Sequence, residues 1–327
     1  MNEFQRMMRR LIMVVALAAL LPAAVSAAHA DNGAPITIEP DGAAPLNDGP
    51  TNGTDDEDDP PIPPDALSEE FYVYVSAPGN GNVAGIAYAD EDVLMQDTAT
   101  GQWTKVFDGT NAGLPAGADI DALDYQNVNL HSMFYLSFDK PVAVPGLGTV
   151  DDSDVVLRSC FLGTCAWSLT FDGSAHGLTT AAEDIDGLDV LPAGNLLIST
   201  SGNFNVPKYG GGTLLGGDED VINYLAAYNN YGMRLDGSTK GLAAGNDLRA
   251  FDFDRHFAPD RDWIFLSFED AFTYSNSSLP GVAGQPDDIF VDEMPSGGSA
   301  GAPRVGTLWD AETAGFPRVD AIELIAK

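Results

Sequence analysis

Short apolar runs recur along the chain from residue 71 onward, and each run is bounded by Gly, Asp, Asn or Pro. Runs of this length, rich in Val, Ile, Leu and aromatic residues, predict β-strands that are separated by turns. No window keeps a helical period of apolar positions, so we expect little helix. The chain is therefore predicted to be all-β after residue 70.

The runs repeat in a fixed order of four signals. The first signal is an acid followed by apolar residues, as in Asp92-Val93-Leu94. It recurs at Asp154, Asp220 and Asp288, at spacings of 62, 66 and 68 residues. The other three signals are a run ending in Asp-Gly or its relic, the pattern Asp-Ile-Asp-Ala-Leu-Asp, and an apolar run ending in Ser; their first complete copies lie at residues 103–109, 119–124 and 134–138. Four strands in each repeat of about 65 residues are typical of a propeller blade.

The ends of the repeat region are out of phase with the repeat. An extra copy of the fourth signal, residues 71–76, precedes the first full repeat, and the chain finishes just after the third signal at Ile325. The leftover strands together make one blade, so the C-terminal strand can complete the blade that the N-terminal strand begins. Such closure removes exposed sheet edges. We therefore predict a four-bladed β-propeller; a β-sandwich of hairpins is the alternative.

The order of the signals also resembles propellers of the NHL type and similar exported families. The segment 187–199 shows it best, because Gly187 to Val190, a turn at residues 192–195 and Leu196 to Ser199 are similar to the first strand, glycine turn and second strand of such a blade. The resemblance covers most of residues 71–327, although these blades are longer. It implies a fold whose first strand is innermost, and it implies no chemistry.

The first 70 residues are predicted to lie outside the propeller. Residues 1–30 have an arginine-rich start, an apolar run from Leu11 to Val25 and a small-residue cleavage pattern at Ala28-His29-Ala30, the build of a secretory signal peptide. Residues 31–70 are rich in Asp, Gly and Pro and predict an extended linker. The protein is therefore expected to be exported, to the periplasm or beyond.

Charge and cysteine content narrow the partners. The chain has 49 Asp and Glu against 15 Lys and Arg, so its surface repels nucleic acid and anionic membranes and attracts divalent cations. Solubility alone would also explain this acidity. The two cysteines, Cys160 and Cys165, flank a short loop between predicted strands, and in an oxidising compartment we expect them to form a disulfide.

Acids repeated in every blade are the first candidates for a site. If the third signal is the innermost strand, its acids form rings around the channel, and oxygen ligands there suit Ca²⁺. The alternative is that each acid caps a turn or accepts a backbone N–H between blades. The candidate metal ligands are Asp121, Asp124, Asp186, Asp189, Asp252 and Asp320.

A departure from the repeat is the second candidate. Arg249 replaces the acid of the third signal in one blade, and the connection that follows it is long and rich in charged and aromatic residues. This connection could form a binding loop or only a local ion-pair network. Its candidate binding residues are Arg249, Arg255, His256 and Trp263.

Catalytic patterns are hard to find in the chain. It has no G-x-S-x-G elbow, and His131, His176 and His256 each stand alone. We therefore favour a non-enzymatic, exported binding or surface-associated propeller, stabilised by Ca²⁺, with a protein or a carbohydrate as its ligand. The alternatives are a hydrolase or lyase that acts on carbohydrate through channel-facing carboxylates, and a purely structural envelope component.

Overall fold

The computed structural model describes residues 70–258, 261–276, 279–295, 305–316 and 318–327. The predicted signal peptide and nearly all of the predicted linker lie outside these residues. Within the described part of the chain, none of the helices has the length and apolar character needed to cross a bilayer.

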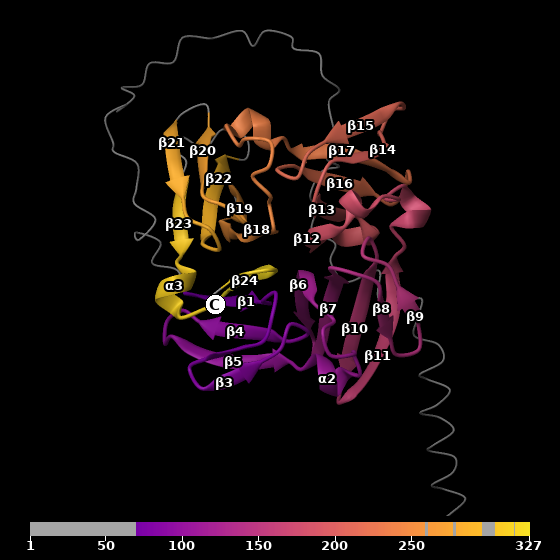
Figure 1. Ribbon diagram of the computed structural model, residues 1–327, viewed down its shortest axis with the longest axis vertical. Helices are drawn as coiled ribbons and strands as arrows, with labels where there is room; N and C mark the ends of the chain where they lie inside the picture. Colours follow the sequence, from indigo (N-terminus) through magenta and orange to yellow (C-terminus); the bar gives the residue numbers. More distant parts are fainter. Residues whose placement is uncertain (1–69, 259–260, 277–278, 296–304, 317) are drawn as a thin grey trace, which may run out of the picture. The chain divides into compact units, whose positions relative to one another are not determined.

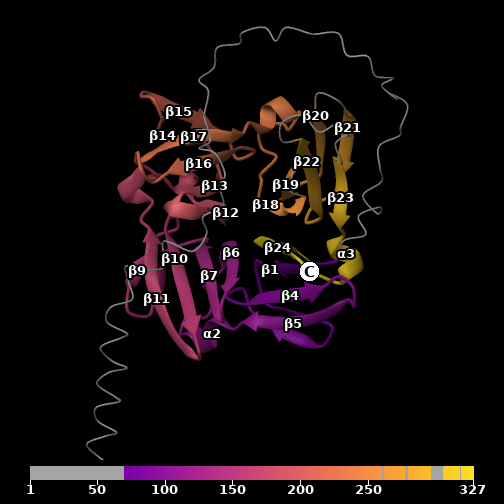
Figure 2. The same ribbon diagram turned by 180° about the vertical axis from the view of Figure 1, so that it is seen from behind.

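The described residues form four four-stranded antiparallel sheets arranged in a ring, which confirms the predicted four-bladed propeller (Figures 1 and 2). Each blade is numbered in chain order and its strands run from the innermost to the outermost. Blade 1 is β24 (Ile322–Ala326), β1 (Phe71–Val75), β4 (Val93–Asp97) and β5 (Gln102–Phe107); blade 2 is β6 (Ile120–Val128), β7 (His131–Phe138), β10 (Val155–Phe161) and β11 (Thr164–Phe171); blade 3 is β12 (Ile185–Val190), β13 (Leu196–Thr200), β16 (Val221–Leu225) and β17 (Asn230–Leu235); blade 4 is β18 (Ala250–Ala258), β19 (Arg261–Ser267), β22 (Ile289–Pro295) and β23 (Val305–Trp309).

The ring closes as the phase of the repeats predicts. Strand β24 (yellow in Figure 1) pairs antiparallel with β1 (indigo), with Phe71 opposite Ala326 and Val75 opposite Ile322. Backbone hydrogen bonds between Ser76 and the residues Asp320 and Ala321 extend this pairing at one end. Blade 1 is therefore built from both ends of the described chain.

Each blade contains an additional hairpin that the sequence did not predict. The connection between the second and third strands of each blade includes two short paired strands. They are β2 (Gly81–Val83) with β3 (Ile86–Tyr88), β8 (Val142–Val144) with β9 (Gly148–Val150), β14 (Phe204–Pro207) with β15 (Thr213–Gly216), and β20 (Phe272–Asn276) with β21 (Leu279–Gly284). These hairpins account for the length of the blades. In blades 1 and 2 the strands of these hairpins have three residues each, too few to show an alternation that sequence can reveal.

The acids of the first and second sequence signals together stabilise the turn that follows the outermost strand. Asp92 accepts a hydrogen bond from the backbone N–H of Gly109 at 3.0 Å, and Asp108 caps the short helix α2 (Gly109–Ala112) by accepting from Asn111 N–H. A Cβ at residue 109 would lie 2.2 Å from the Glu91 carbonyl oxygen, so glycine is required there. The same acid-to-backbone bond recurs in the other blades, from Gly173 to Asp154, Gly237 to Asp220 and Ala311 to Asp288.

Similar short helices follow the outer strand of every blade. The equivalents of α2 are η3 (Ser174–His176), η6 (Gly237–Lys240) and α3 (Ala311–Ala314); two further single turns, η4 (Ala181–Glu183) and η5 (Pro192–Gly194), lie in blade 3. Asp236 and Asp310 cap η6 and α3 as Asp108 caps α2. The repeated acids of the first and second signals are thus structural.

The hydrophobic core lies between neighbouring blades, in four clusters. At the closure, the Trp103 ring of blade 1 lies 5.4 Å from Phe316 and 6.3 Å from Trp309 of blade 4. The Trp309 indole N–H also donates to Gln96 of β4 at 2.6 Å. Aromatic packing and this buried hydrogen bond hold the last blade against the first.

The predicted disulfide is present. Cys160 in β10 and Cys165 in β11 lie opposite one another and are bonded across the hairpin. The bond lies next to the turn that joins these two strands, as the spacing of the cysteines predicts.

Candidate carboxylate site at the channel mouth

The innermost strand of each blade carries acids at two levels. Where these strands begin, they place six carboxyl groups, which we call the mouth carboxylates: Asp119, Asp121, Asp184, Asp186, Asp247 and Asp320. Further along the same strands lie four more, which we call the inner carboxylates: Asp124, Asp189, Asp252 and Glu323. The two levels differ in what surrounds them.

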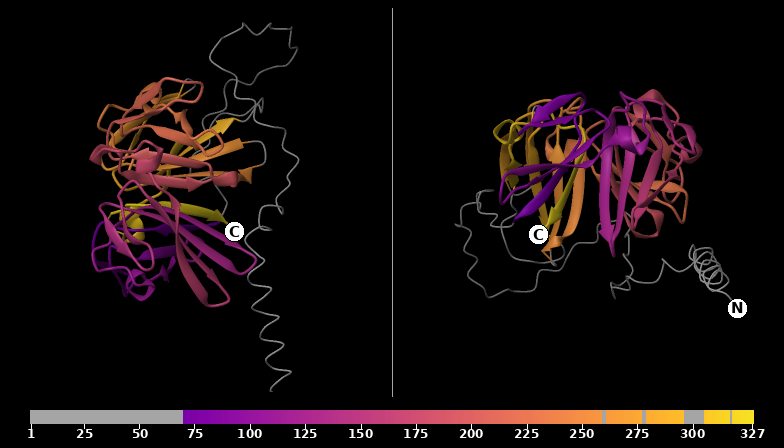
Figure 3. Two further views of the ribbon diagram at one scale, coloured as in Figure 1. Left: turned by 90° about the vertical axis from the view of Figure 1, so that its right-hand side faces the viewer. Right: turned by 90° about the horizontal axis from the view of Figure 1, so that it is seen from below.

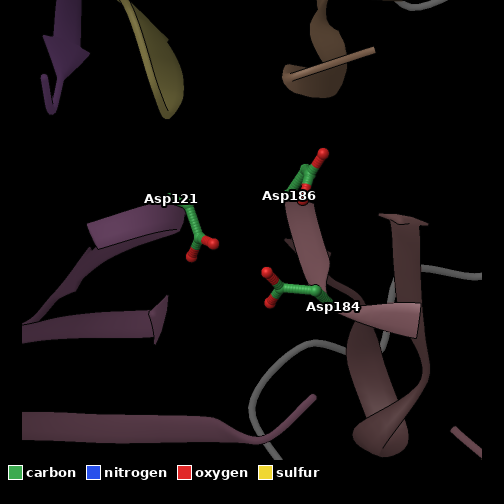
Figure 4. Close-up of side chains that lie close together, drawn as sticks. All are labelled: Asp121, Asp184 and Asp186. Carbon is green, nitrogen blue, oxygen red and sulfur yellow. The ribbon is translucent and has the colours of Figure 1, made fainter. Parts of the chain in front are cut away.

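Three of the mouth carboxylates come together from two blades. Asp121 of blade 2 and Asp184 and Asp186 of blade 3 each offer an oxygen, and these oxygens all lie within 4.8 Å of one another. Figure 4 shows the carboxyl groups of Asp121 and Asp184 turned toward each other across the space between the blades. Two oxygens bound to one Ca²⁺ at 2.3–2.6 Å are at most about 5 Å apart. The spacing of the three groups therefore fits one shared cation.

Asp121 is buried with one carboxyl oxygen that lacks a hydrogen-bond partner, and one oxygen of Asp184 shares this deficit among the described residues. The side chain of Asp121 keeps only 7% of its accessible surface, and its Oδ1 has no hydrogen-bond partner among the described residues. A buried polar atom without a partner costs free energy, typically about 1–3 kcal/mol. A bound cation would remove this cost.

The pKa values of the three carboxyl groups also show that burial together disfavours their charged forms. Burial and the nearby charges of Asp184 and Asp186 raise the pKa of Asp121 well above its usual range. Burial and the neighbouring Asp152 raise the pKa of Asp184 to about 8. Burial and the adjacent Asp247 likewise raise the pKa of Asp186. The metal-free site therefore retains protons at pH values where ordinary carboxyl groups are ionised.

A β-bulge positions two of the three ligands. In blade 2 the pairing of β6 with β7 skips Asp121, and in blade 3 the pairing of β12 with β13 skips Asp186. A bulge inserts one unpaired residue into a strand and redirects its side chain, and bulges are frequent beside functional sites. The two bulges are the local reason that these carboxyl groups gather at the mouth.

The opposite side of the mouth is neutralised by Arg249. Its guanidinium group lies 2.9 Å from Glu269 and 3.5 Å from Asp320, and Arg318 also binds Glu269 at 2.6 Å. Burial raises the pKa of Asp320 to about 6, while Arg249 acts to lower it. Asp320 therefore serves as the counter-ion of Arg249, and the mouth has one anionic side and one ion-paired side.

Two of the inner carboxylates accept hydrogen bonds from backbone groups of the next blade. Asp124 of blade 2 accepts a hydrogen bond from Val190 N–H of blade 3 at 2.7 Å, and Asp252 of blade 4 accepts one from Leu324 N–H of blade 1 at 2.9 Å. Burial nonetheless raises the pKa of Asp124 to about 7 and that of Glu323 well above its usual range. The hydrogen bonds of Asp124 and Asp252 therefore join neighbouring blades.

The predicted metal ligands thus divide into two groups. The structure brings together Asp121 and Asp186, whereas Asp124 and Asp252 accept backbone bonds, and Asp189 is buried at that inner level. Asp320 pairs with Arg249. Sequence reasoning missed Asp184, although it begins the same Asp-Ile-Asp signal as Asp186. The repeat showed the acids but not which of them a bulge would turn toward the channel.

The predicted binding loop after Arg249 is not a loop. Strands β18 and β19 continue through most of it, so the connection is a long hairpin. Trp263 is buried within β19, because the pattern of this strand places it in the core. The backbones of Arg255 and His256 belong to β18, and their side chains lie outside the described residues.

Two other surfaces are distinct from the mouth. The rings of Tyr209 and Tyr228 in blade 3 lie 4.9 Å apart and are 40% and 61% exposed, which is the kind of surface on which a sugar ring can stack. A separate open pocket of about 470 Å³ is lined by Glu70, Thr98, Trp309 and their neighbours at the junction of blades 1 and 4. Neither contains a mouth carboxylate.

No family model and no curated protein matches the chain. Among solved structures, the extracellular domain of a one-component system protein from B. thetaiotaomicron is similar at 9% identity and a TM-score of 0.30, over 73% of this chain and 39% of that one. A protein from Lactobacillus plantarum is similar at 9% identity and a TM-score of 0.29, over 78% of this chain and 99% of that one. The chain thus spans less than half of the first of these proteins.

Proposed function

We propose that this protein is an exported, non-enzymatic binding propeller, loosely of the NHL type, whose channel mouth binds Ca²⁺ through Asp121, Asp184 and Asp186. The observation that carries the proposal is the approach of these three oxygens to within 4.8 Å, at a place where Asp121 and Asp186 are buried and Asp184 is partly buried. Three carboxylates from two blades supply part of the six to eight oxygens that Ca²⁺ takes, and carbonyl groups or water supply the rest.

The bound ion would have a structural consequence. Two of its ligands belong to blade 3 and one belongs to blade 2, so the ion would join two blades that otherwise repel one another at this point. Ligand binding to the folded state stabilises it by about 2.7 kcal/mol at a hundredfold excess over the dissociation constant. The ion would therefore stabilise the arrangement of blades 2 and 3 at the channel mouth.

A thermal melt tests the proposal. Chelator is expected to lower the Tm of the full protein, and added Ca²⁺ to restore it, while Mg²⁺ restores less because it demands a smaller and more rigid shell. Asp186→Asn is expected to lose the response. The matched control is Asp124→Asn, another buried Asp on an inner strand, whose amide oxygen can still accept from Val190 N–H and which should keep the response. An unchanged wild-type melting curve would refute the calcium site.

The enzymatic alternative uses the same groups. A carboxyl group protonated at neutral pH beside a second one is what general acid catalysis on a glycoside needs, and the pKa of Asp184, about 8, meets the first condition. Turnover in a screen of glycan substrates that is lost in both Asp184→Asn and Asp186→Asn would favour this function over the binding role.

A further inference from the structure

Two hairpin turns of blade 2 each contain an exposed leucine whose backbone is strained. The turn between β6 and β7 is Asn129-Leu130, and the turn between β10 and β11 is Leu162-Gly163. The φ angles of the two leucines are +68° and +48°. Two-residue hairpin turns of this shape favour Asn and Gly, because a branched side chain at positive φ meets the backbone. Both leucines therefore occupy positions that their own backbone disfavours.

The same leucines are among the most exposed apolar residues of the described chain. Leu130 is 75% exposed and Leu162 is 72% exposed, and their neighbours Val128 and Phe161 are 54% and 46% exposed. Strain that the surrounding fold maintains, at residues that gain nothing from burial, points to a function of the exposed group.

The two turns form one apex. His131 beside the first turn lies opposite Phe161 beside the second, and their rings are 4.7 Å apart. The Cys160–Cys165 disulfide fixes the second hairpin directly behind its turn. The right-hand view of Figure 3 shows long strands of blade 2 (purple to magenta) and of blade 4 (orange) that extend toward the same side of the ring. We call Val128, Leu130, Phe161 and Leu162 the apolar apex.

The apex and the strand segments next to it contain no acid, although the chain as a whole is rich in acids. Residues 125–138 and 155–171 include no Asp or Glu, whereas the whole chain has 49; Arg158 is the one Lys or Arg of these two segments, and His131 is their one histidine. The segment therefore avoids the negative charge that would keep the rest of the surface away from an apolar or anionic layer.

From these observations we propose that the apolar apex of blade 2 inserts into the interface of a lipid bilayer. A bilayer suits the shape of the apex, because lipids can surround a small convex tip that offers four apolar side chains. A stable protein interface buries about 800 Å² on each partner and needs a broader surface than this tip. Phe161 and His131 would lie at headgroup level, where aromatic rings are favoured.

The proposal is independent of the calcium site, because the two lie at opposite ends of the same strand. Asp121 stands near the start of β6, and the first turn of the apex follows its last residue, Val128. Loss of calcium binding therefore does not predict loss of lipid binding, and either can fail alone.

Flotation of the full protein with phosphatidylcholine vesicles tests the proposal. The wild type is expected to float with the vesicles. The double variant Leu130→Gly, Leu162→Asn converts both turns to Asn-Gly and is expected to bind at least tenfold less. Because it also relieves both strained turns, its Tm should equal or exceed that of the wild type, so that weaker binding cannot be ascribed to misfolding. Leu215→Asn, at a 66% exposed leucine on β15 of blade 3, is the matched control and should bind as the wild type does.

Three results would overturn the proposal. The first is wild-type protein that stays in the dense fraction, and the second is a double variant that floats as well as the wild type. The third is a dimer in gel filtration that the double variant abolishes while its vesicle binding is unchanged, which would assign the apex to a second copy of the chain.

Discussion

The mouth and inner carboxylates belong to the same innermost strands of the four blades, yet their carboxyl groups contact different partners. Asp124 and Asp252 are buried and accept backbone N–H groups of the next blade, so their charge is used in holding the ring together. Asp121 is equally buried, but it faces Asp184 and Asp186. The availability of a backbone N–H donor, rather than the burial of the acid, separates a structural carboxylate from a candidate ligand.

The largest expected effect comes from breaking an inner carboxylate. Asp252→Ala leaves the Leu324 N–H without its acceptor in the buried contact between blades 4 and 1. We expect the free energy of unfolding to fall by about 1–3 kcal/mol, the typical cost of a buried polar group that loses its partner. Denaturant unfolding measures it, and the gain in stability from Ca²⁺ should be retained. Loss of that gain would show that the two levels are not separate.

Breaking a mouth carboxylate should have the reverse effect on the metal-free protein. Asp121→Asn replaces a carboxyl group whose charged form its neighbours disfavour with a neutral amide of the same shape, so the variant in chelator is expected to be as stable as the wild type or more stable. It should lose most of the stabilisation by Ca²⁺, about 2.7 kcal/mol at a hundredfold excess of ion for an intact site. Calorimetric titration with Ca²⁺ gives the affinity directly. A variant that is clearly less stable in chelator would mean that Asp121 has a structural partner.

The pH dependence sharpens the contrast further. The pKa of Asp124 is about 7 in the folded protein and about 3.9 in an unfolded chain, so the folded state binds more protons between these values. The free energy of unfolding in chelator should therefore fall as pH rises from about 4 to about 7. The slope of this fall is set by the additional proton that the folded state binds. Asp124→Asn should flatten the slope in urea titrations. A stability that rises over this range would contradict the raised pKa.

The smallest expected effect is at the ion-paired side of the mouth. Arg249→Gln removes the cation that neutralises Asp320 and Glu269. The added negative potential should strengthen Ca²⁺ binding a few-fold, an effect that salt weakens. Titrations at low and high ionic strength measure it, with Arg158→Gln in the outer strands of blade 2 as the control. Weaker binding in Arg249→Gln would place Arg249 among the groups that build the site.

Repeat phase made most of this fold predictable from sequence. The copy of the Ser-ending signal at residues 71–76 and the final strand at residues 322–326 required a closed ring, and β1 and β24 pair as expected. The added hairpins were not foreseen, because strands such as β8 with three residues leave no readable alternation. The buried position of Trp263 was also missed. The charged residues beside it suggested a loop, whereas the structure has two paired strands there.

The candidate site was only partly predictable. Repetition identified the acids, and it also suggested that many of them were structural, as the N–H bonds to Asp124 and Asp252 show. It could not rank Asp184 above Asp320. That choice depends on two bulges and on the guanidinium group of Arg249, which are properties of the folded ring.

The pairing of β1 with β24 also sets the order of events during synthesis. Blade 1 lacks its innermost strand until Ile322–Ala326 has been made, and the contact of Asp252 with Leu324 has to wait for the same segment. A chain that emerges from its N-terminus therefore has three complete sheets and one with an open inner edge until residues 322–326 appear. The ring therefore cannot close through the pairing of β1 with β24 before residues 322–326 have been made.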